Sequence, residues 1–179
     1  QGVQVPEILA SDLKQGFILL SDFGDHLYLN LLNANNVDAL YEKALSVLPR
    51  IQACQQNITN WPLPHFDEVA IQRELALFPE WFLRKHLNFT TTATVEKLLT
   101  DTFSLLTQSA LEQPQLCVHR DYHSRNLLLL EDGGVGVLDF QDAVWGPVTY
   151  DLVSILRDCY IAWPQQQVEK WALSFYEKI

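Results

Sequence analysis

The stretch His119-Arg120-Asp121-Tyr122-His123-Ser124-Arg125-Asn126, followed by Leu138-Asp139-Phe140, is the most informative part of this sequence. Asp121 and Asn126 are five residues apart, so one tight loop can present both to a small site. Asp139 follows after a segment long enough for one hairpin, which would return it to the side of Asn126. Phosphoryl transfer needs such a set, because one carboxylate receives the proton of the acceptor hydroxyl while an amide and a second carboxylate hold the magnesium ions of ATP. The stretch therefore predicts a kinase site.

The segments around this stretch predict a suitable scaffold. Residues 116–118, 127–130 and 135–138 are short apolar runs, as expected for buried strands, and Asp132-Gly133-Gly134 predicts a turn between the last two. Magnesium prefers octahedral oxygen ligands and keeps waters and phosphates among them, so one Asn and one Asp provide enough protein ligands. The alternative is a hairpin with polar tips and no chemistry, in which Asp139 is only a turn residue.

The residues after Asp139 distinguish between kinds of kinase. Protein kinases continue from the metal-binding Asp into a long activation loop. Here Phe140-Gln141 follows, and Gly146-Pro147 comes soon after. Residues 150–162 then have helical periodicity, with Leu152, Ile155, Leu156 and Cys159 on one face. Little length remains to present a peptide, so the sequence predicts a small-molecule acceptor.

The rest of the chain predicts a strand followed mostly by helices. Residues 17–20 are an apolar run that predicts the strand, and residues 21–25 a hinge after it. Helical periodicity extends over residues 37–54, 67–87, 94–112 and 165–179. In the helix at 94–112, the residues expected to face inward are Val95, Leu98, Leu99, Phe103 and Leu106.

Composition limits the class of protein and its partners. The 179 residues are 48% hydrophobic, enough for one domain or one large lobe with a buried core. The formal net charge of −10 disfavours nucleic acid and anionic membranes, since both are bound by clustered Lys and Arg. No signal-peptide pattern or long apolar run is present. Cys54, Cys117 and Cys159 are scattered without CxxC spacing, which predicts reduced thiols in a cytoplasmic protein.

These motifs resemble those of the aminoglycoside phosphotransferase and choline kinase-like small-molecule kinases. That family carries a His-x-Asp-x-x-x-x-Asn loop, a metal-binding Asp before an aromatic residue, and a Gly-Pro-x-x-x-Asp-Leu segment. Residues 119–126, 139–140 and 146–152 match these motifs in turn. The resemblance implies ATP and Mg²⁺ as cofactors. It also implies roles for five residues: Asp121 as catalytic base, Asn126 and Asp139 as magnesium ligands, and His119 and Asp151 as structural support.

The resemblance further implies an α+β, protein kinase-like fold. A complete kinase of this fold has an N-terminal lobe with a phosphate-covering loop and an ion-paired strand lysine, and neither is visible here. Residues 1–25 resemble the end of that lobe and the hinge, and residues 26–179 the helical C-terminal lobe with its catalytic hairpins. We therefore expect a fragment that lacks most of the N-terminal lobe. Backbone groups of Ser21, Asp22 and Phe23 could bond adenine, although an ordinary turn at Gly24 would explain the same residues.

Within the family, the sequence most resembles the bacterial cell-wall sugar kinases, which phosphorylate the anomeric hydroxyl of N-acetylmuramate and N-acetylglucosamine in peptidoglycan recycling. The segments that carry this likeness are residues 20–25, 63–68, 73–75, 78–81, 119–126, 139–143 and 150–152. The resemblance thus implies an amino-sugar acceptor. An aminoglycoside or choline-type kinase, and a non-catalytic pseudokinase-like binding module, are the alternatives.

Four more residues are the main candidates for binding the acceptor. Glu68 and Arg73, together with the neighbouring Glu74, could hydrogen-bond sugar hydroxyls or an acetamido group, or they could form solvent-facing pairs. Asp142 and Trp145 follow the metal-binding Asp closely and could line the acceptor pocket, or they could form a structural turn. The sequence does not predict the oligomeric state.

Overall fold

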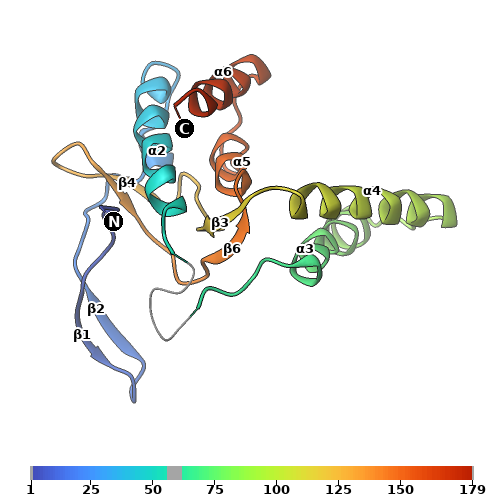
Figure 1. Cartoon of the computed structure of the whole chain (residues 1–179), viewed down its shortest axis with the longest axis horizontal. Coiled ribbons are helices and arrows are strands. Elements are labelled where there is room, and N and C mark those ends of the chain that lie inside the picture. Colours follow the sequence, from blue (N-terminus) through green and yellow to red (C-terminus); the bar gives the residue numbers. More distant parts are fainter. Residues whose placement is uncertain (1, 56–61, 179) are drawn as a thin grey trace.

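The computed structural model describes residues 2–55 and 62–178 of the chain. These residues form helices and three small antiparallel sheets of two strands each, which confirms the expected α+β class (Figure 1). The first sheet is a hairpin of β1 (Ile8–Asp12) and β2 (Phe17–Leu20), so the strand expected at 17–20 is confirmed. Every residue of both strands is exposed to solvent.

The other two sheets carry the segment that contains the kinase motif. β3 (Gln115–Val118) pairs with β6 (Val144–Pro147), and β4 (Leu127–Leu129) pairs with β5 (Val135–Val137). The three strands predicted here, and the turn between β4 and β5, are confirmed. β6 escaped prediction because Gly and Pro weaken strands. Its Pro147 is tolerated at the end of a two-stranded sheet, where every strand is an edge.

The largest core lies around α2 (Val37–Gln52), which confirms the helix expected from residue 37. Its buried residues recur every three or four positions, so one stripe faces inward: Leu40, Ala44, Leu48 and Ile51. A short helix, α1 (Tyr28–Leu31), precedes it. Tyr122, from the loop after β3, is fully buried in this core and donates its hydroxyl hydrogen bond to the carbonyl oxygen of Ala44 at 2.8 Å.

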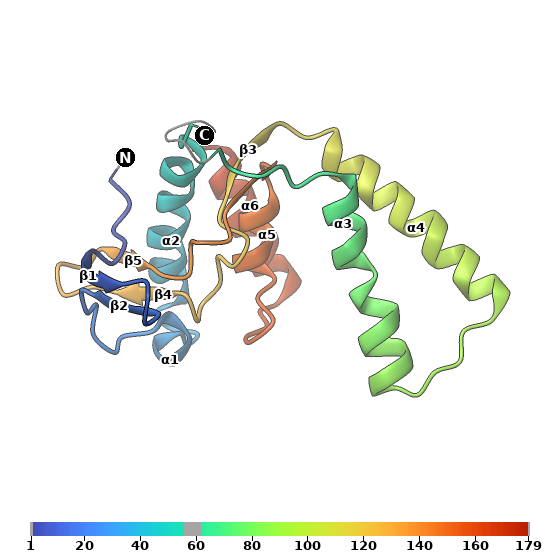
Figure 2. The ribbon, with the colours of Figure 1, turned by 90° about the horizontal axis from the view of Figure 1, so that it is seen from below.

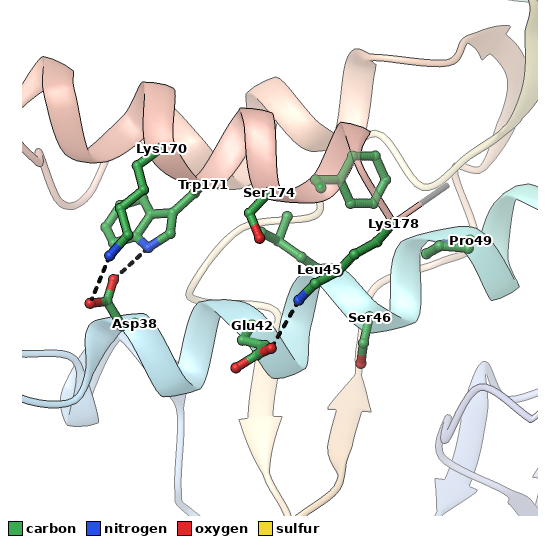
Figure 3. A pocket seen from close by; sticks show the side chains of 10 residues that line it. Asp38, Glu42, Leu45, Ser46, Pro49, Lys170, Trp171, Ser174 and Lys178 are labelled. Atoms are coloured by element: carbon green, nitrogen blue, oxygen red, sulfur yellow. Dashed lines mark hydrogen bonds and ion pairs between the residues drawn. The ribbon is translucent and has the colours of Figure 1, made fainter.

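The last helix, α6 (Gln165–Tyr176), packs beside α2 (Figures 1 and 3). Across a groove of about 420 Å³, the indole of Trp171 donates to Asp38 at 2.7 Å, and Lys178 pairs with Glu42 at 2.9 Å. The Lys178 pair is more than half exposed and therefore adds little stability. Trp171 and Phe175 are buried, and this burial of apolar surface contributes most of the stability of the packing between α6 and α2. The helix was expected to run to residue 179 but ends at Tyr176, and residue 179 lies outside the described residues.

Three helical segments form an arm that extends away from the core (Figure 2): α3 (Glu68–Leu75), η1 (Phe78–His86) and α4 (Ala93–Leu111). We call residues 68–111 the helical arm. The single helix expected at 67–87 is wrong, because it is divided into α3 and the π-helical η1. Pro79 has no N–H to donate to the preceding turn, so a regular α-helix cannot continue through it. Asp67 caps α3 by accepting from the amide of Ala70 at 3.0 Å.

The expected position of α4 is confirmed, but part of its expected inward face is wrong. Leu98 and Leu106 are exposed, whereas Val95, Leu99 and Phe103 are half-buried. The arm stands away from the core over much of its length (Figure 2), so α4 has a partner on only one side. An apolar stripe predicts a buried face only where a second layer covers it.

The helix expected at 150–162 is also shorter than predicted. α5 (Tyr150–Leu156) ends before Arg157, and Cys159 is exposed instead of facing inward. Buried Asp158 accepts from the amide of Tyr160 at 2.8 Å, and this local bond replaces helical hydrogen bonding. Within residues 2–55 and 62–178, no helix is long and apolar enough to cross a membrane.

Candidate active site

The loop of residues 119–126 starts at the end of β3 and is held by a buried carboxylate. Asp151, in the first turn of α5, is 1% exposed and accepts from the amides of His119 at 2.8 Å and Arg120 at 3.0 Å. Burial raises the pKa of Asp151 from 3.8 to about 6, while the two amide hydrogen bonds act against that rise. The charge of Asp121 adds a smaller rise. The start of the loop is therefore fixed through its backbone.

His119 connects this loop to the β4–β5 hairpin. Its Nε2 lies 2.9 Å from the carbonyl oxygen of Leu138, a contact that needs the ring proton on Nε2. The ring is buried, and burial lowers the pKa of His119 below its ordinary value. Neutral His119 thus fixes the backbone of Leu138, the residue before Asp139.

The structure brings Asp121, Asn126 and Asp139 together. The amide of the Asn126 side chain donates to the backbone oxygen of Asp121 at 3.0 Å, and the backbone amide of Leu138 donates to the backbone oxygen of Asn126 at 2.9 Å. Arg120 and Asp139 have φ angles of 77° and 63°, a left-handed conformation that is uncommon outside glycine. Such backbone angles often occur at functional sites, and here one residue directly precedes Asp121 and the other is Asp139 itself.

The donor set at these residues fits magnesium better than a larger cation. Among the described residues, no group of three or more His, Cys, Asp or Glu side chains could enclose a metal ion. An ion between Asn126 and Asp139 would therefore have two protein ligands, and water and phosphate oxygens would supply the rest. Magnesium accepts this arrangement, whereas calcium usually takes more protein oxygens.

The predicted hinge lies against the same hairpin. The amide of Ser21 donates to the oxygen of Glu7 at 2.9 Å, so this N–H is already bonded within the segment. Asp22 accepts from the amide of Gly24 at 2.8 Å. A Cβ atom at Gly136 of β5 would lie only 2.6 Å from the ring of Phe23, so only glycine permits this approach. The hinge thus packs on the hairpin that carries Asp139.

The four predicted acceptor residues are more dispersed. Glu68 and Arg73 are exposed on α3, where Glu68 accepts from Gln72 at 2.9 Å. Asp142 is exposed after Asp139. Trp145 is half-buried within β6 and bonds through its backbone to the segment at 64–66. The roles predicted for these four residues remain predictions.

A cavity of about 640 Å³ lies between the helical arm and the loop of residues 119–126. Glu74 of α3 crosses to the core there, accepting from Arg120 at 2.5 Å and from the hydroxyl of Tyr150 at 3.0 Å. The side chains of Glu74 and Arg120 are both about one-third exposed, at 31% and 32%. The sequence alone did not indicate whether Glu74 faces the core or the solvent. The available signal was an acid beside Ile71 and Leu75 on the apolar face of α3.

The residues after α5 complete the other side of this cavity. Asp158 accepts from the amide of Ser124 at 2.9 Å, which ties this segment to the loop of residues 119–126. The ring of His123 lies edge-on to Tyr160, with centroids 5.3 Å apart, and both His123 and Arg157 line the cavity. These contacts were missed because the expected helix continued past residue 156.

Comparison with known proteins agrees with this geometry. The family model described as "Phosphotransferase enzyme family" matches residues 1–177. The chain belongs to this phosphotransferase family. Its fold resembles the choline kinase of Streptococcus pneumoniae (TM-score 0.62, 15% identity, 98% of this chain and 56% of that one). It also resembles an aminoglycoside phosphotransferase of Streptomyces rimosus in complex with ADP and streptomycin (TM-score 0.66, 14% identity, 99% and 69%). The expected kinase-like fold is confirmed.

Curated relatives in this phosphotransferase family carry a more specific name. The chain is 46% identical to the N-acetylmuramate/N-acetylglucosamine kinase of Pseudomonas aeruginosa over 177 residues, which cover 99% of the chain and 51% of the relative. It is 42% identical to the protein of that name from Pseudomonas putida over 176 residues, covering 98% and 51%. The chain thus spans about half the length of these relatives.

Proposed function

We propose that this chain forms the catalytic lobe of an ATP-dependent kinase that phosphorylates the anomeric hydroxyl of N-acetylmuramate or N-acetylglucosamine. The convergence of Asp121, Asn126 and Asp139 on one loop and one hairpin is the observation that carries the proposal. The name of the relatives with 42–46% identity supports the amino-sugar acceptor. Solved relatives of the same fold with ADP or ATP bound support nucleotide use.

In this mechanism Asp121 receives the acceptor's proton. The acceptor hydroxyl would attack the γ-phosphorus as ADP leaves, and Asp121 would orient that hydroxyl and take its proton late in the reaction. The transition state is loose, so positioning supplies most of the rate and a strong base is not required. Asn126 and Asp139 would hold Mg²⁺, which neutralises charge on the phosphate oxygens when bound. Asp151 holds the start of the 119–126 loop, and His119 holds that loop against the end of the β4–β5 hairpin.

The cavity between the helical arm and the core is where we place the acceptor. Its lining includes Arg120 and His123, the residues on either side of Asp121-Tyr122. A volume of about 640 Å³ lies within the range of small-molecule sites and suits an amino sugar. Its polar groups, among them Glu74 and Tyr150, match the hydroxyl and acetamido groups of such a sugar.

The test is ATP consumption by the full-length natural protein with Mg²⁺ and four acceptors: N-acetylmuramate, N-acetylglucosamine, kanamycin and choline. We expect turnover with the amino sugars, and a fall in kcat of about 100-fold or more in Asp121→Asn, as removal of a general base implies. Asp101→Asn, an exposed carboxylate on the arm, is the matched control and should keep its activity.

Each contrary result has a distinct meaning. Turnover only with kanamycin or choline would preserve the kinase and reject the amino sugar. Wild-type turnover in a well-folded Asp121→Asn protein would reject the assigned base. Lack of turnover and of ATP binding would favour a pseudokinase-like module.

A further inference from the structure

The cavity beside the 119–126 loop contains an uncompensated positive charge. Two of its charged residues neutralise one another, because Glu74 and Arg120 form an ion pair at 2.5 Å. Arg157 lines the same cavity, and within residues 2–55 and 62–178 it forms no ion pair with a carboxylate. Its guanidinium donates one hydrogen bond to the amide oxygen of Gln165. A guanidinium has five N–H donors, so further donors remain for a ligand.

The position of Arg157 is fixed relative to the site. It follows the last residue of α5 and precedes Asp158, whose buried carboxylate bonds the amide of Ser124 at 2.9 Å. Arg157 is therefore held between a helix end and an anchor on the loop that carries Asp121. These contacts fix the backbone at Arg157, whose exposed side chain lines the cavity.

Arg120 is less suited to bind a ligand than Arg157. Its guanidinium already contacts Glu74 and lies 5.8 Å from the centre of the Phe66 ring. A ligand carboxylate at Arg120 would have to displace the carboxylate of Glu74 or lie beside it. Two neighbouring carboxylates repel each other. Arg157 lines the same cavity and has no ion-paired carboxylate among the described residues.

We propose that Arg157 binds the carboxylate of an acidic amino sugar, and so distinguishes N-acetylmuramate from N-acetylglucosamine. This inference rests on the proposed function. The two sugars differ in the lactyl ether of N-acetylmuramate, which ends in a carboxylate. A guanidinium matches a carboxylate with two parallel hydrogen bonds, a geometry that lysine cannot reproduce. In a protein of formal net charge −10, a local cation also offsets the general repulsion of an anionic acceptor.

The test compares the two sugars in Arg157→Gln, with steady-state kinetics at saturating ATP on the full-length protein. We expect the KM for N-acetylmuramate to rise by about 10-fold or more, as loss of a charge-assisted hydrogen bond implies. The KM for N-acetylglucosamine should change less than about 2-fold, because this sugar has no carboxylate that could pair with Arg157. Arg157→Lys should lie between the wild type and Arg157→Gln for N-acetylmuramate alone.

Lys97→Gln is the matched control, since it removes one positive charge from the exposed face of α4. Equal changes for both sugars in Arg157→Gln, or none for either, would overturn the inference while the amino-sugar kinase stands. Failure of the wild type to phosphorylate either sugar would overturn the proposed function and this inference together. Arg157 is exposed, so the variant should fold, and its thermal unfolding checks that.

Discussion

Replacing Asp151 with Asn should change how the stability of the protein depends on pH. The wild-type carboxylate is buried, and its pKa is raised from 3.8 to about 6 in the folded protein. The folded state therefore binds more protons than the unfolded state between these two values. Stability must then fall as pH rises through this window. At 1.36 kcal/mol for each unit of pKa, ionised Asp151 costs the folded protein about 3 kcal/mol at neutral pH.

The Asn variant has no proton to lose, so this component is absent from its unfolding free energy. It also replaces one acceptor with a donor facing the amides of His119 and Arg120, which should cost about 1–3 kcal/mol at low pH. As pH rises from 4 to 7, the wild type should lose about 2–3 kcal/mol relative to the variant. The variant is therefore most destabilised in acid and approaches the wild type near neutrality.

Urea unfolding of both proteins at pH 4, 5, 6 and 7 and constant ionic strength measures this difference. Carboxylates with lowered pKa, such as those of Glu42, Glu96 and Asp132, shift stability in the opposite direction. They are common to both proteins and cancel in the difference. Unfolding free energies that stay parallel within about 0.5 kcal/mol would refute the argument that burial dominates at Asp151.

Two further changes test contacts on either side of the loop. Glu74→Gln should raise the KM for the acceptor by about 5-fold, because a neutral amide hydrogen-bonds a sugar hydroxyl about 1 kcal/mol more weakly than a carboxylate does; kinetics at saturating ATP with an unchanged KM would contradict this. Tyr122→Phe should lower the free energy of unfolding by about 1 kcal/mol, because it removes a buried hydrogen bond to Ala44. A urea midpoint equal to that of the wild type would show that this bond contributes nothing.

The local arrangement of the site was predictable because its residues are close in sequence. Asp121 and Asn126 share one loop, and a single hairpin returns Asp139 beside them, so strand periodicity and turn chemistry sufficed. The fold class was implied by the resemblance of these motifs to a known kinase family. Helix positions from residue 37 and around residue 94 followed from apolar periodicity.

The features that escaped prediction depend on contacts between distant segments. Glu74 looks like any exposed acid until α3 is placed against Tyr150, more than seventy positions later. α5 ends before Asp158, whose carboxylate accepts hydrogen bonds from the amides of Ser124 and Tyr160. The apolar periodicity of the sequence gives no sign of these contacts. Pro79 is visible in the sequence, yet the π-helical turn that accommodates it depends on backbone geometry.

Under the proposed function, the helical arm contributes to the acceptor cavity but not to the reaction centre. Asp121, Asn126 and Asp139 all belong to the core, whereas one wall of the cavity comes from α3 and α4. The arm contacts the loop through Glu74 but supplies none of the residues proposed to act on the phosphate. Under the proposed function, substitutions in the arm would therefore alter one wall of the acceptor cavity and leave Asp121, Asn126 and Asp139 in place.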